Sequence, residues 1–270
     1  MFAEERQQLI VGLIYASGRA SVTDLAERFS ITTETIRRDL AALEAAGSVR
    51  RVHGGAVSPD RISTTEESIL ERTVQRQPEK TRIAEAALAL IPQALTGSIL
   101  IDAGSTTEAL AELLSARAAG AAATGNLPAS DAELVVITHS LPIASRLSGE
   151  PGIALHLLGG KVRGLTQAAV GQSTVEAARR IRPDIAFIGT NGIHAAFGLS
   201  TPDPEEAAVK AAFVQSARRI VVLADSSKLD AETLVQFASL KDLDTVITDK
   251  QPSRELADAL AEAGVEVVVA

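Results

Sequence analysis

Cysteine is absent from this 270-residue chain, and aromatic residues make up only 3% of it. The lack of cysteine excludes disulfide bonds, cysteine-ligated zinc and thiol nucleophiles, and it is typical of proteins from a reducing cytosol. With no tryptophan and one tyrosine, an aromatic platform for single-stranded nucleic acid is not expected. The four histidines are scattered without ligand spacing, so we expect neither a metal site nor a cofactor.

Long apolar runs are also missing. No stretch contains eighteen consecutive apolar residues, so no membrane span is expected. The first ten residues are charged and lack the apolar core of a signal peptide, which predicts a cytoplasmic protein. The length allows one large domain or two smaller ones, and the 46% apolar and 22% charged fractions are ordinary for folded chains.

Negative charge is unevenly distributed along the chain. The formal net charge is -8, which argues against a protein that coats nucleic acid or anionic membranes. Residues 1–61 carry eight arginines and eight acids, whereas the remaining 209 residues carry 18 bases and 26 acids. The N-terminal segment is therefore the part of the chain best suited to approach a polyanion.

Three helical patterns and a hairpin fill residues 1–57. Apolar residues recur at helical spacing in the first fifteen positions. Ser21 is placed to cap a second, short helix, and Thr32 is placed to cap a third helix that ends near Ala46. The segment 48–57 suits a basic hairpin with a tight glycine turn. This order of elements predicts a winged helix-turn-helix domain, whose third helix enters the major groove of double-stranded DNA.

Polar side chains of this domain are the candidates for DNA contact. The first residues of the third helix would reach base edges, while helix N-terminal amides and arginines would hold phosphates. A small helical docking domain, whose arginines form a solvated face, is the alternative. The expected DNA-binding residues are Ser21, Thr33, Thr35, Arg37, Arg38, Arg50, Arg51 and His53.

A second domain is expected after a polar, proline-containing linker over 58–78. Over 79–270, apolar strand-like runs alternate with helical segments, which predicts an α/β domain with a largely parallel sheet. One expected helix covers 107–117. The stretch 116–130 is rich in small residues, and we expect it to form a mobile surface insertion.

Polar loops follow the expected strands of this domain. Ligands of open parallel sheets bind at the carboxyl ends of the strands, so these loops form the candidate site. In the loop 102–107, hydroxyl groups and helix N-terminal amides suit an anion, although a plain capped turn is the alternative. Solvated turns and a surface ion pair are the alternatives for the later loops. The candidate residues are Asp102, Gly104, Ser105, Thr106, Thr107, Thr138, His139, Gly160, Arg163, Gly189, Asp203, Glu206, Lys210 and Lys228.

Several motifs of the chain resemble the DeoR family of bacterial transcriptional regulators. The N-terminal resemblance rests on residues 34–40, 43–44 and 51–56. The C-terminal resemblance rests on Glu206-Ala207 with Lys210 and on the stretches 102–107, 158–160, 184–189, 224–228 and 247–249. These motifs stand in the family's order, and the resemblance covers nearly the whole chain.

The resemblance implies a fold and a ligand. The C-terminal domain of this family is similar in fold to ribose-5-phosphate isomerase, and it binds a phosphorylated sugar or polyol that usually releases a repressor from its operator. The loop 104–107 would then hold the phosphate. Four further residues would contact sugar hydroxyls, the phosphate or the domain that moves: Asp203, Glu206, Lys210 and Lys228.

The implied protein is a DNA-binding repressor of sugar-uptake and sugar-catabolism genes, and not an enzyme. It would act as a homodimer or homotetramer, because one recognition helix reads too few base pairs. The stretch 189–206 looks most like fructose-operon and sugar-phosphotransferase regulators of actinobacteria, so fructose 1-phosphate is the preferred effector. Fructose 6-phosphate, tagatose phosphates and glycerol 3-phosphate are alternatives. An isomerase-like enzyme with an appended DNA-binding domain, and a regulator without a small ligand, are the other hypotheses.

One residue departs from the family pattern. The family commonly has asparagine after the strand-end Thr138, whereas this chain has His139. Imidazole is bulkier than an amide and can titrate. A changed or pH-sensitive ligand contact is an alternative, but we expect a tolerated substitution at the rim of the pocket.

Overall fold

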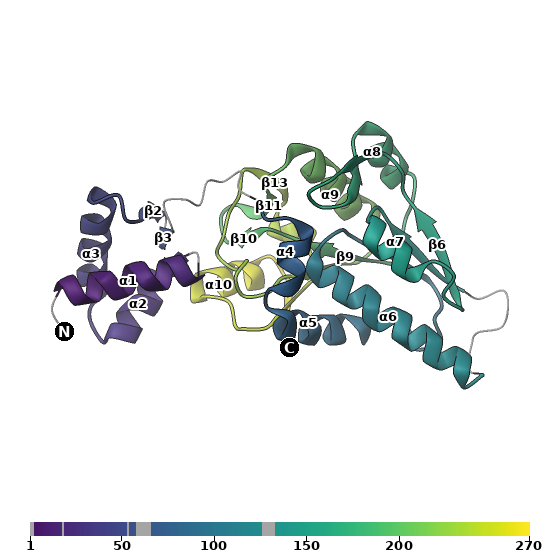
Figure 1. The fold of residues 1–270 in the computed structure, drawn as a ribbon, viewed down its shortest axis with the longest axis horizontal. Helices are drawn as coiled ribbons and strands as arrows, with labels where there is room; N and C mark the ends of the chain where they lie inside the picture. Colours follow the sequence, from purple (N-terminus) through teal and green to yellow (C-terminus); the bar gives the residue numbers. More distant parts are fainter. Residues whose placement is uncertain (1–2, 18, 53, 58–65, 126–132) are drawn as a thin grey trace. The chain divides into compact units, whose positions relative to one another are not determined.

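The computed structural model describes the chain except for residues 1–2, 18, 53, 58–65 and 126–132 (Figure 1). The chain divides into two compact units, Met1–Thr65 and Glu66–Ala270, which we call the small unit and the large unit. Within the described part of the chain, no helix is both long enough and apolar enough to cross a membrane.

The small unit combines three helices with a three-stranded antiparallel sheet of order β1-β3-β2. Side-chain hydroxyls cap two of the helices as predicted, since Ser21 accepts from the Asp24 amide and Thr32 from the Thr35 amide. The elements are α1 (Ala3–Ser17), β1 (Arg19–Ser21), α2 (Val22–Phe29), α3 (Thr33–Ala45), β2 (Arg50–Val52) and β3 (Gly55–Val57). The predicted winged helix-turn-helix is confirmed. Strand β1 is not predicted, because it is defined by its pairing with β3 rather than by an apolar pattern.

A nearly buried ion pair joins α1 to α3 inside the small unit. Asp39 accepts hydrogen bonds from Arg6 Nε at 2.6 Å and from Arg6 Nη2 at 3.1 Å, and a third from Gln7 Nε2 at 3.0 Å. The hydrogen bond from Arg6 to Asp39 is the main cause that raises the pKa of the guanidinium. This pair lies beside the apolar core formed by residues such as Ile10, Ile36 and Leu40.

The large unit is built around a seven-stranded sheet of order β15-β14-β12-β9-β4-β5-β6. All neighbouring strands in it are parallel, which confirms the predicted α/β class. The strands are β4 (Ser98–Ile101), β5 (Leu134–Thr138), β6 (Ile153–Leu157), β9 (Ile185–Gly189), β12 (Ile220–Leu223), β14 (Thr245–Thr248) and β15 (Glu266–Val269).

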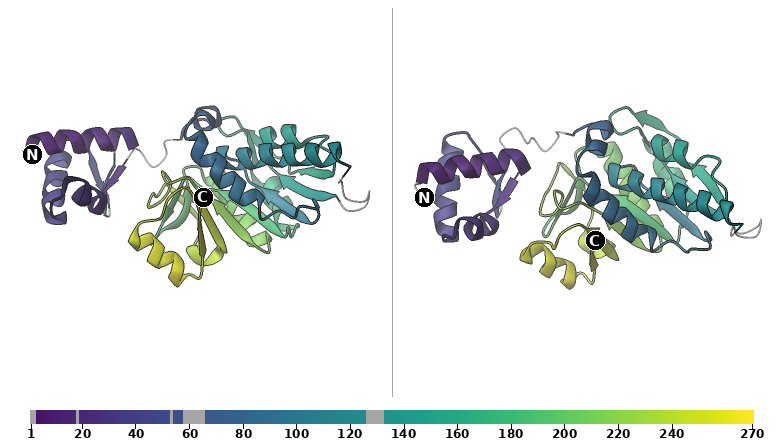
Figure 2. Two further views of the ribbon diagram at one scale, coloured as in Figure 1. Left: turned by 90° about the horizontal axis from the view of Figure 1, so that it is seen from below. Right: turned by 60° about the horizontal axis from the view of Figure 1, so that its bottom comes forward.

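Helices cover both faces of this sheet (Figure 2). Successive residues of a strand point to opposite faces, so a sheet buried on both sides requires continuous apolar runs. Accordingly, Ile99 and Ile101 belong to one core cluster and Leu100 to the other. The first cluster is covered by α5 (Gln77–Leu88), α6 (Ser105–Ala123) and α7 (Leu141–Leu147). The second is covered by α8 (Gln172–Arg179), α9 (Pro204–Ser216) and α10 (Arg254–Glu262).

Several short elements of the large unit are not predicted. They are α4 (Ile69–Val74), β7 (Lys161–Arg163), β8 (Ala168–Val170), β10 (Gly192–His194), β11 (Gly198–Thr201), β13 (Val235–Ala238) and a 3₁₀ turn (Leu240–Asp242). Strands β7 and β8 pair with each other, and β10, β11 and β13 form a separate sheet. Runs of three to six residues are too short for a periodic apolar pattern to identify them.

Two expected segment boundaries differ from the structure. Residues 66–78, expected in the linker, belong to the large unit, where they form α4 and the start of α5. Residues 116–123, expected in a surface insertion, continue α6 to Ala123, because Ala118 is buried in the core. The rest of that expected insertion lies largely outside the described residues.

The strand order reverses direction next to β4. The chain proceeds from β4 outward to β5 and β6, then returns to place β9 on the other side of β4. In open parallel sheets, ligands bind in the crevice at such a switch point, beyond the carboxyl ends of the strands. The topology therefore predicts that a ligand site of the large unit lies at the loops after β4 and β9.

Candidate functional site

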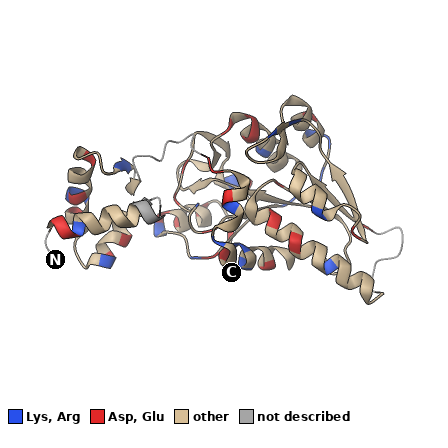
Figure 3. Cartoon of the chain, viewed as in Figure 1, with Lys and Arg blue, Asp and Glu red and all other residues tan. Residues whose placement is uncertain are grey.

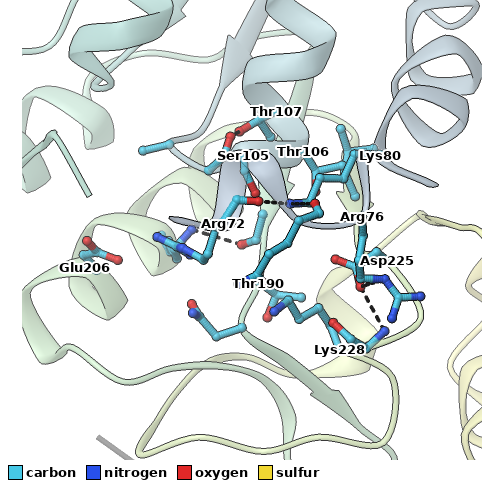
Figure 4. A pocket seen from close by; sticks show the side chains of 18 residues that line it. Arg72, Arg76, Lys80, Ser105, Thr106, Thr107, Thr190, Glu206, Asp225 and Lys228 are labelled. Carbon is cyan, nitrogen blue, oxygen red and sulfur yellow. Dashed lines mark hydrogen bonds and ion pairs between the residues drawn. The ribbon is translucent and has the colours of Figure 1, made fainter. Parts of the chain in front are cut away.

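A cleft lies at this switch point. Its walls come from the loops after β4, β9 and β12, from α9, and from the segment that includes α4 and the start of α5. Figure 4 shows Lys80, Ser105 and Thr107 along one side of the cleft, with Lys228 opposite and Glu206 at one end. The lining residues are Arg72, Gln75, Arg76, Lys80, Ala103, Gly104, Ser105, Thr106, Thr107, Gly189, Thr190, Asn191, Glu206, Lys210, Leu223, Asp225, Ser227 and Lys228.

The N-terminus of α6 forms one side of the cleft. Gly104 is the N-cap residue, and Ser105, Thr106 and Thr107 form the first turn. The first-turn amides of a helix have no acceptor within the helix, and they carry the positive end of its dipole. The Thr107 hydroxyl donates to Gly104 O at 2.8 Å, which holds the turn closed. This geometry suits an anion with several acceptor oxygens.

Three basic residues of the α4–α5 segment face the same cleft. Arg72, Arg76 and Lys80 all line it. None of the three was predicted, because residues 58–78 were expected to form a linker and Lys80 lies just after it. Their spacing of four suggests one helical face, but the structure places Arg72 on α4, Arg76 in a left-handed conformation between the helices and Lys80 on α5.

Lys80 carries a buried positive charge in this wall. Its residue is only 6% exposed, and its ammonium group donates to the carbonyl oxygens of Arg72 and Gln75. Burial lowers the pKa of Lys80 to about 8, against a partial opposing effect of Asp225. Carbonyl oxygens do not neutralise an ammonium group, so an anion in the cleft would stabilise its charged form.

A buried cluster of Asp102, Lys210 and His139 supports the floor of the cleft. Asp102 is fully buried and accepts from the Lys210 ammonium group and, at 2.9 Å, from the Gly189 amide. Burial raises the pKa of Asp102, but the charge of Lys210 and the contact with His139 outweigh it, so the pKa lies below its ordinary value. Asp102 thus positions Lys210, which lines the cleft, and does not line the cleft itself.

His139 lies behind this cluster and not at the rim of the pocket, so that expectation is wrong. The residue is 1% exposed, and its Nδ1 lies 2.7 Å from Ala169 O. A carbonyl can only accept, so Nδ1 carries a hydrogen. Nε2 lies 3.0 Å from Asp102 Oδ1 and 3.1 Å from the Ala103 amide nitrogen, so it can donate to the carboxylate or accept from the amide. The imidazole therefore fixes the turn that leads into the α6 N-terminus.

A network of charges joins one end of the cleft to the start of the large unit. Arg163 contacts Glu206 at 3.1 Å, Asp203 at 3.1 Å and Glu66 at 2.6 Å. Glu206 lines the cleft, while Glu66 is the first described residue after positions 58–65. The Asp203 carboxylate also caps α9 by accepting from the Glu206 amide at 2.9 Å. Arg163 and Asp203 thus do not line the cleft, but both contact Glu206, which does.

The side of the cleft opposite α6 combines acids, amides and a lysine. Asp225 is 2% exposed, and its Oδ1 lies 3.3 Å from Arg76 Nε. Burial raises the pKa of Asp225, but Lys228, Ser227 and Arg76 together keep it below its ordinary value. Alternating donors and acceptors of this kind suit the hydroxyl groups of a polyol.

The structure brings eight of the fourteen candidate ligand residues to the cleft. They are Gly104, Ser105, Thr106, Thr107, Gly189, Glu206, Lys210 and Lys228. The other six lie behind its walls: Asp102, Thr138, His139, Gly160, Arg163 and Asp203. Thr138 is buried and donates to Ile101 O at 2.7 Å. Gly160 is a packing position, because a Cβ there would lie 2.1 Å from Thr174 Oγ1.

The described candidate DNA-binding residues of the small unit lie on α3 and β2 and at Ser21, which ends β1 and caps α2. Thr33, Arg37 and Arg38 are exposed on α3, where Glu34 lies 3.7 Å from each arginine. Figure 3 shows these alternating charges on α3 and the basic colour of β2. Thr35 is half-buried, and its hydroxyl hydrogen-bonds that of Thr32 at 2.9 Å.

The remaining candidates of the small unit differ in exposure. Arg50 and Arg51 are exposed on β2. The Arg51 amide donates to Glu44 at 3.0 Å, which ties the hairpin to α3. Ser21 is half-buried because its hydroxyl caps α2. His53 lies outside the described residues.

Known proteins share both units. Family profiles match residues 6–62 as a DeoR-like helix-turn-helix domain and residues 75–250 as a DeoR C terminal sensor domain. The chain belongs to the DeoR family of transcriptional regulators. A member from Haloferax volcanii, the HTH-type transcriptional regulator GlpR, is 33% identical over 99% of this chain and 98% of its own length. The glycerol-3-phosphate regulon repressor of Escherichia coli K12 is 28% identical over 96% and 95%, respectively.

A structural likeness also exists to a ribose 5-phosphate isomerase A from Methanocaldococcus jannaschii. It covers 57% of this chain and 55% of that chain, with a TM-score of 0.39 and 18% identity.

Proposed function

We propose that this DeoR-family regulator is a repressor of genes for the uptake and breakdown of a sugar or polyol. A phosphorylated form of that compound would bind in the cleft of the large unit and release the protein from its operator. The observation that carries the proposal is the un-neutralised Lys80 ammonium group beside the first turn of α6. A phosphate has enough acceptor oxygens for the ammonium group, the helix amides and the Ser105 hydroxyl together.

The opposite side of the cleft supports a polyol as the rest of the ligand. Asn191 and Thr190 supply acceptors and donors there, Lys228 adds a cation, and Glu206 adds a carboxylate at one end of the cleft. Fructose 1-phosphate is the preferred effector by resemblance. The Escherichia coli relative is named for glycerol 3-phosphate, so glycerol 3-phosphate is the alternative effector.

The small unit would read the operator. In this proposal α3 lies in the major groove, with Thr33, Thr35, Arg37 and Arg38 near base edges and phosphates. Arg50 and Arg51 would hold the backbone beside it. Two copies of the chain, in a dimer or tetramer, would read two half-sites about one helical turn, roughly 34–36 Å, apart.

A thermal-shift panel tests the ligand. Fructose 1-phosphate, fructose 6-phosphate, tagatose phosphates and glycerol 3-phosphate are each compared with the unphosphorylated parent compound. A ligand at about 100 times its Kd adds about 2.7 kcal/mol of stability to the state that binds it. For a domain of this size, that corresponds to roughly 5–10 °C in Tm. A shift with one phosphorylated compound and none with its parent supports the proposal.

The variant Thr106→Glu tests the site. A carboxylate in the first turn of α6 would repel the phosphate, so release of operator DNA by the variant should no longer depend on the phosphorylated ligand. Thr106→Gln, which is similar in size but uncharged, is the matched control. Normal release of the Thr106→Glu variant, measured on operator fragments selected from random-sequence DNA, would contradict the phosphate assignment.

A further inference from the structure

The wall of the cleft that carries its arginines is also the first part of the large unit that the chain forms. Glu66 directly follows residues 58–65, which connect the two units in the sequence. Arg72, Arg76 and Lys80 follow within fifteen residues, and all three line the cleft. One segment, residues 66–80, therefore both lines the cleft and follows the connection to the small unit. We call it the first segment.

Few contacts hold the start of the first segment on the large unit. The buried Ile69 donates its amide to Leu165 O at 2.9 Å, and Glu66 accepts from Arg163 at 2.6 Å. Elsewhere α4 is open, since Leu70 and Val74 are 70% and 72% exposed. A helix of six residues has no stability of its own in water, so its position depends on these few contacts.

Arg76 is paired within the structure, since it lies 3.3 Å from Asp225 and 3.7 Å from Asp249. Arg72 and Lys80 are less fully compensated, and an anion in the cleft would act on these two. Arg72 lies 3.5 Å from Glu66, and its Nε is buried without a hydrogen-bond partner among the described residues. The Lys80 ammonium group contacts carbonyl oxygens, and burial lowers its pKa to about 8. Neighbouring cations repel one another in a partly desolvated wall, and a shared anion would offset that repulsion.

Ion pairs behind the cleft connect the charges of the first segment to its first residue, Glu66. Glu66 lies between Arg72 and Arg163, and Arg163 also contacts Glu206 in the cleft. An anion bound to Arg72 and a ligand hydroxyl bound to Glu206 would therefore each contact one end of this network of ion pairs. Glu66 lies between the two ends, so its position would be fixed as well. The large unit would then hold the chain firmly at Glu66, its first residue.

We propose that the first segment is the element that reports the occupancy of the cleft, being docked when an anion is bound and opening locally when the cleft is empty. This inference rests on the function proposed above and adds its regulatory step. Docking or release changes how much chain next to residues 58–65 is fixed to the large unit. A ligand can shift such an equilibrium because it contacts the docked state alone.

Hydrogen exchange on the full-length protein tests the proposal. Backbone amides of residues 66–76 are compared in inorganic phosphate and in potassium chloride of matched ionic strength. We expect exchange of these amides to slow about tenfold in phosphate, because local opening governs exchange in weakly held segments. Amides of α10, which does not line the cleft, serve as the internal control.

A second arm needs no added ligand. Ser105→Asp places a carboxylate at the first turn of α6, where an acidic residue favours the helix, and Ser105→Asn is its uncharged match. We expect the aspartate variant to protect residues 66–76 in chloride as phosphate does in the unmodified chain, and the asparagine variant not to. Equal exchange in phosphate and chloride, together with equal exchange in the two variants, would overturn the proposal.

The outcomes separate this proposal from the preceding one. If a sugar phosphate raises the Tm without slowing exchange over residues 66–76, the ligand assignment stands and the reporting role of the segment is wrong. If the aspartate and asparagine variants differ as expected while no sugar phosphate raises the Tm, the segment responds to an anion and the proposed effector class is wrong.

Discussion

The small and the large unit place their functional side chains in different ways. On the small unit most of the described candidate residues lie on α3 and β2, and Arg37 and Arg38 are exposed with Glu34 beside them. In the large unit the cleft is assembled from five separate stretches of chain, and several of its charges are buried. Double-stranded DNA is a large, regular surface that one exposed helix can read, whereas a small metabolite has to be surrounded.

This difference predicts how each site fails. A surface site loses affinity step by step as single contacts are removed, since each of them is exposed to water. A buried site depends on residues behind its walls, because an unpaired buried charge destabilises the structure. We therefore expect a substitution in one unit to leave the binding property and the Tm of the other unit unchanged. We also expect the loss of binding to differ in magnitude between the two units. Four experiments would break or sharpen this comparison.

The largest effect is expected for Asp39→Asn, which breaks the ion pair between α1 and α3. Arg6 would keep its charge without a partner in a nearly buried position. Loss of a hydrogen-bonded charge pair of this kind costs roughly 2–3 kcal/mol, a large share of the stability of so small a unit. Operator binding should be lost, while the Tm of the large unit and its shift with ligand remain, as calorimetry would show. Loss of the ligand response as well would contradict the independence of the units.

Lys80→Met should give the next largest effect. The variant removes the ammonium group but keeps most of the aliphatic packing of the side chain. Loss of a charge-assisted contact of 1.5–3 kcal/mol corresponds to about 10- to 100-fold weaker binding of the phosphorylated ligand. Isothermal titration would measure it, with Lys241→Met, an exposed lysine, as the control. Unchanged affinity would remove Lys80 from the site.

Arg38→Ala should weaken operator binding by about 1–3 kcal/mol if Arg38 contacts a base, and less if it contacts a phosphate alone. Its high exposure and single distant carboxylate predict no loss of folding stability. Fluorescence anisotropy at fixed salt would measure the change, with Arg254→Ala on α10 as the matched exposed control. A ligand-induced Tm shift that disappears in Arg38→Ala would contradict the separation of the two sites.

The smallest effect is expected from pH. The pKa of Lys80 is about 8, below its ordinary value of 10.5, so binding of an anion above pH 8 requires uptake of a proton. Ligand affinity should be flat just below pH 8 and fall by up to about tenfold per unit above it. The same lowered pKa means that the unfolded chain binds more protons between pH 8 and 10.5, so the contribution of Lys80 to folding stability rises there. Lys80→Met should abolish both slopes, and a slope that persists would assign it to another group.

The sequence predicted both folds because their elements are encoded locally. The caps at Ser21 and Thr32 and the apolar runs of the parallel sheet appear in the structure at the expected positions. Helical periodicity alone places Arg38 on the face opposite Ile36 and Leu40 and Arg37 on its flank, and both arginines are exposed in the structure. Their contact with DNA stays a prediction.

The ligand site could be predicted only in part. Strand-end loops marked eight residues of the cleft, because parallel strands bring their carboxyl ends to one edge. Sequence could not say which side of each loop faces the cavity, so His139 was expected at the rim, although it is buried against Asp102 and Ala169. It also could not show that Arg72, Arg76 and Lys80 fold back over the cleft, since contacts such as Ile69 to Leu165 join residues far apart in the chain.

The sequence by itself thus determined the two folds, their order and the loop that begins α6, because these depend on periodicity, caps and glycine positions. Only the tertiary structure decided that a segment taken for a linker is a wall of the cleft, and that Asp102, Arg163 and Asp203 support the site from behind. The physical reason is that charge pairing and burial are set by residues distant in sequence, and no local pattern records which of them will meet.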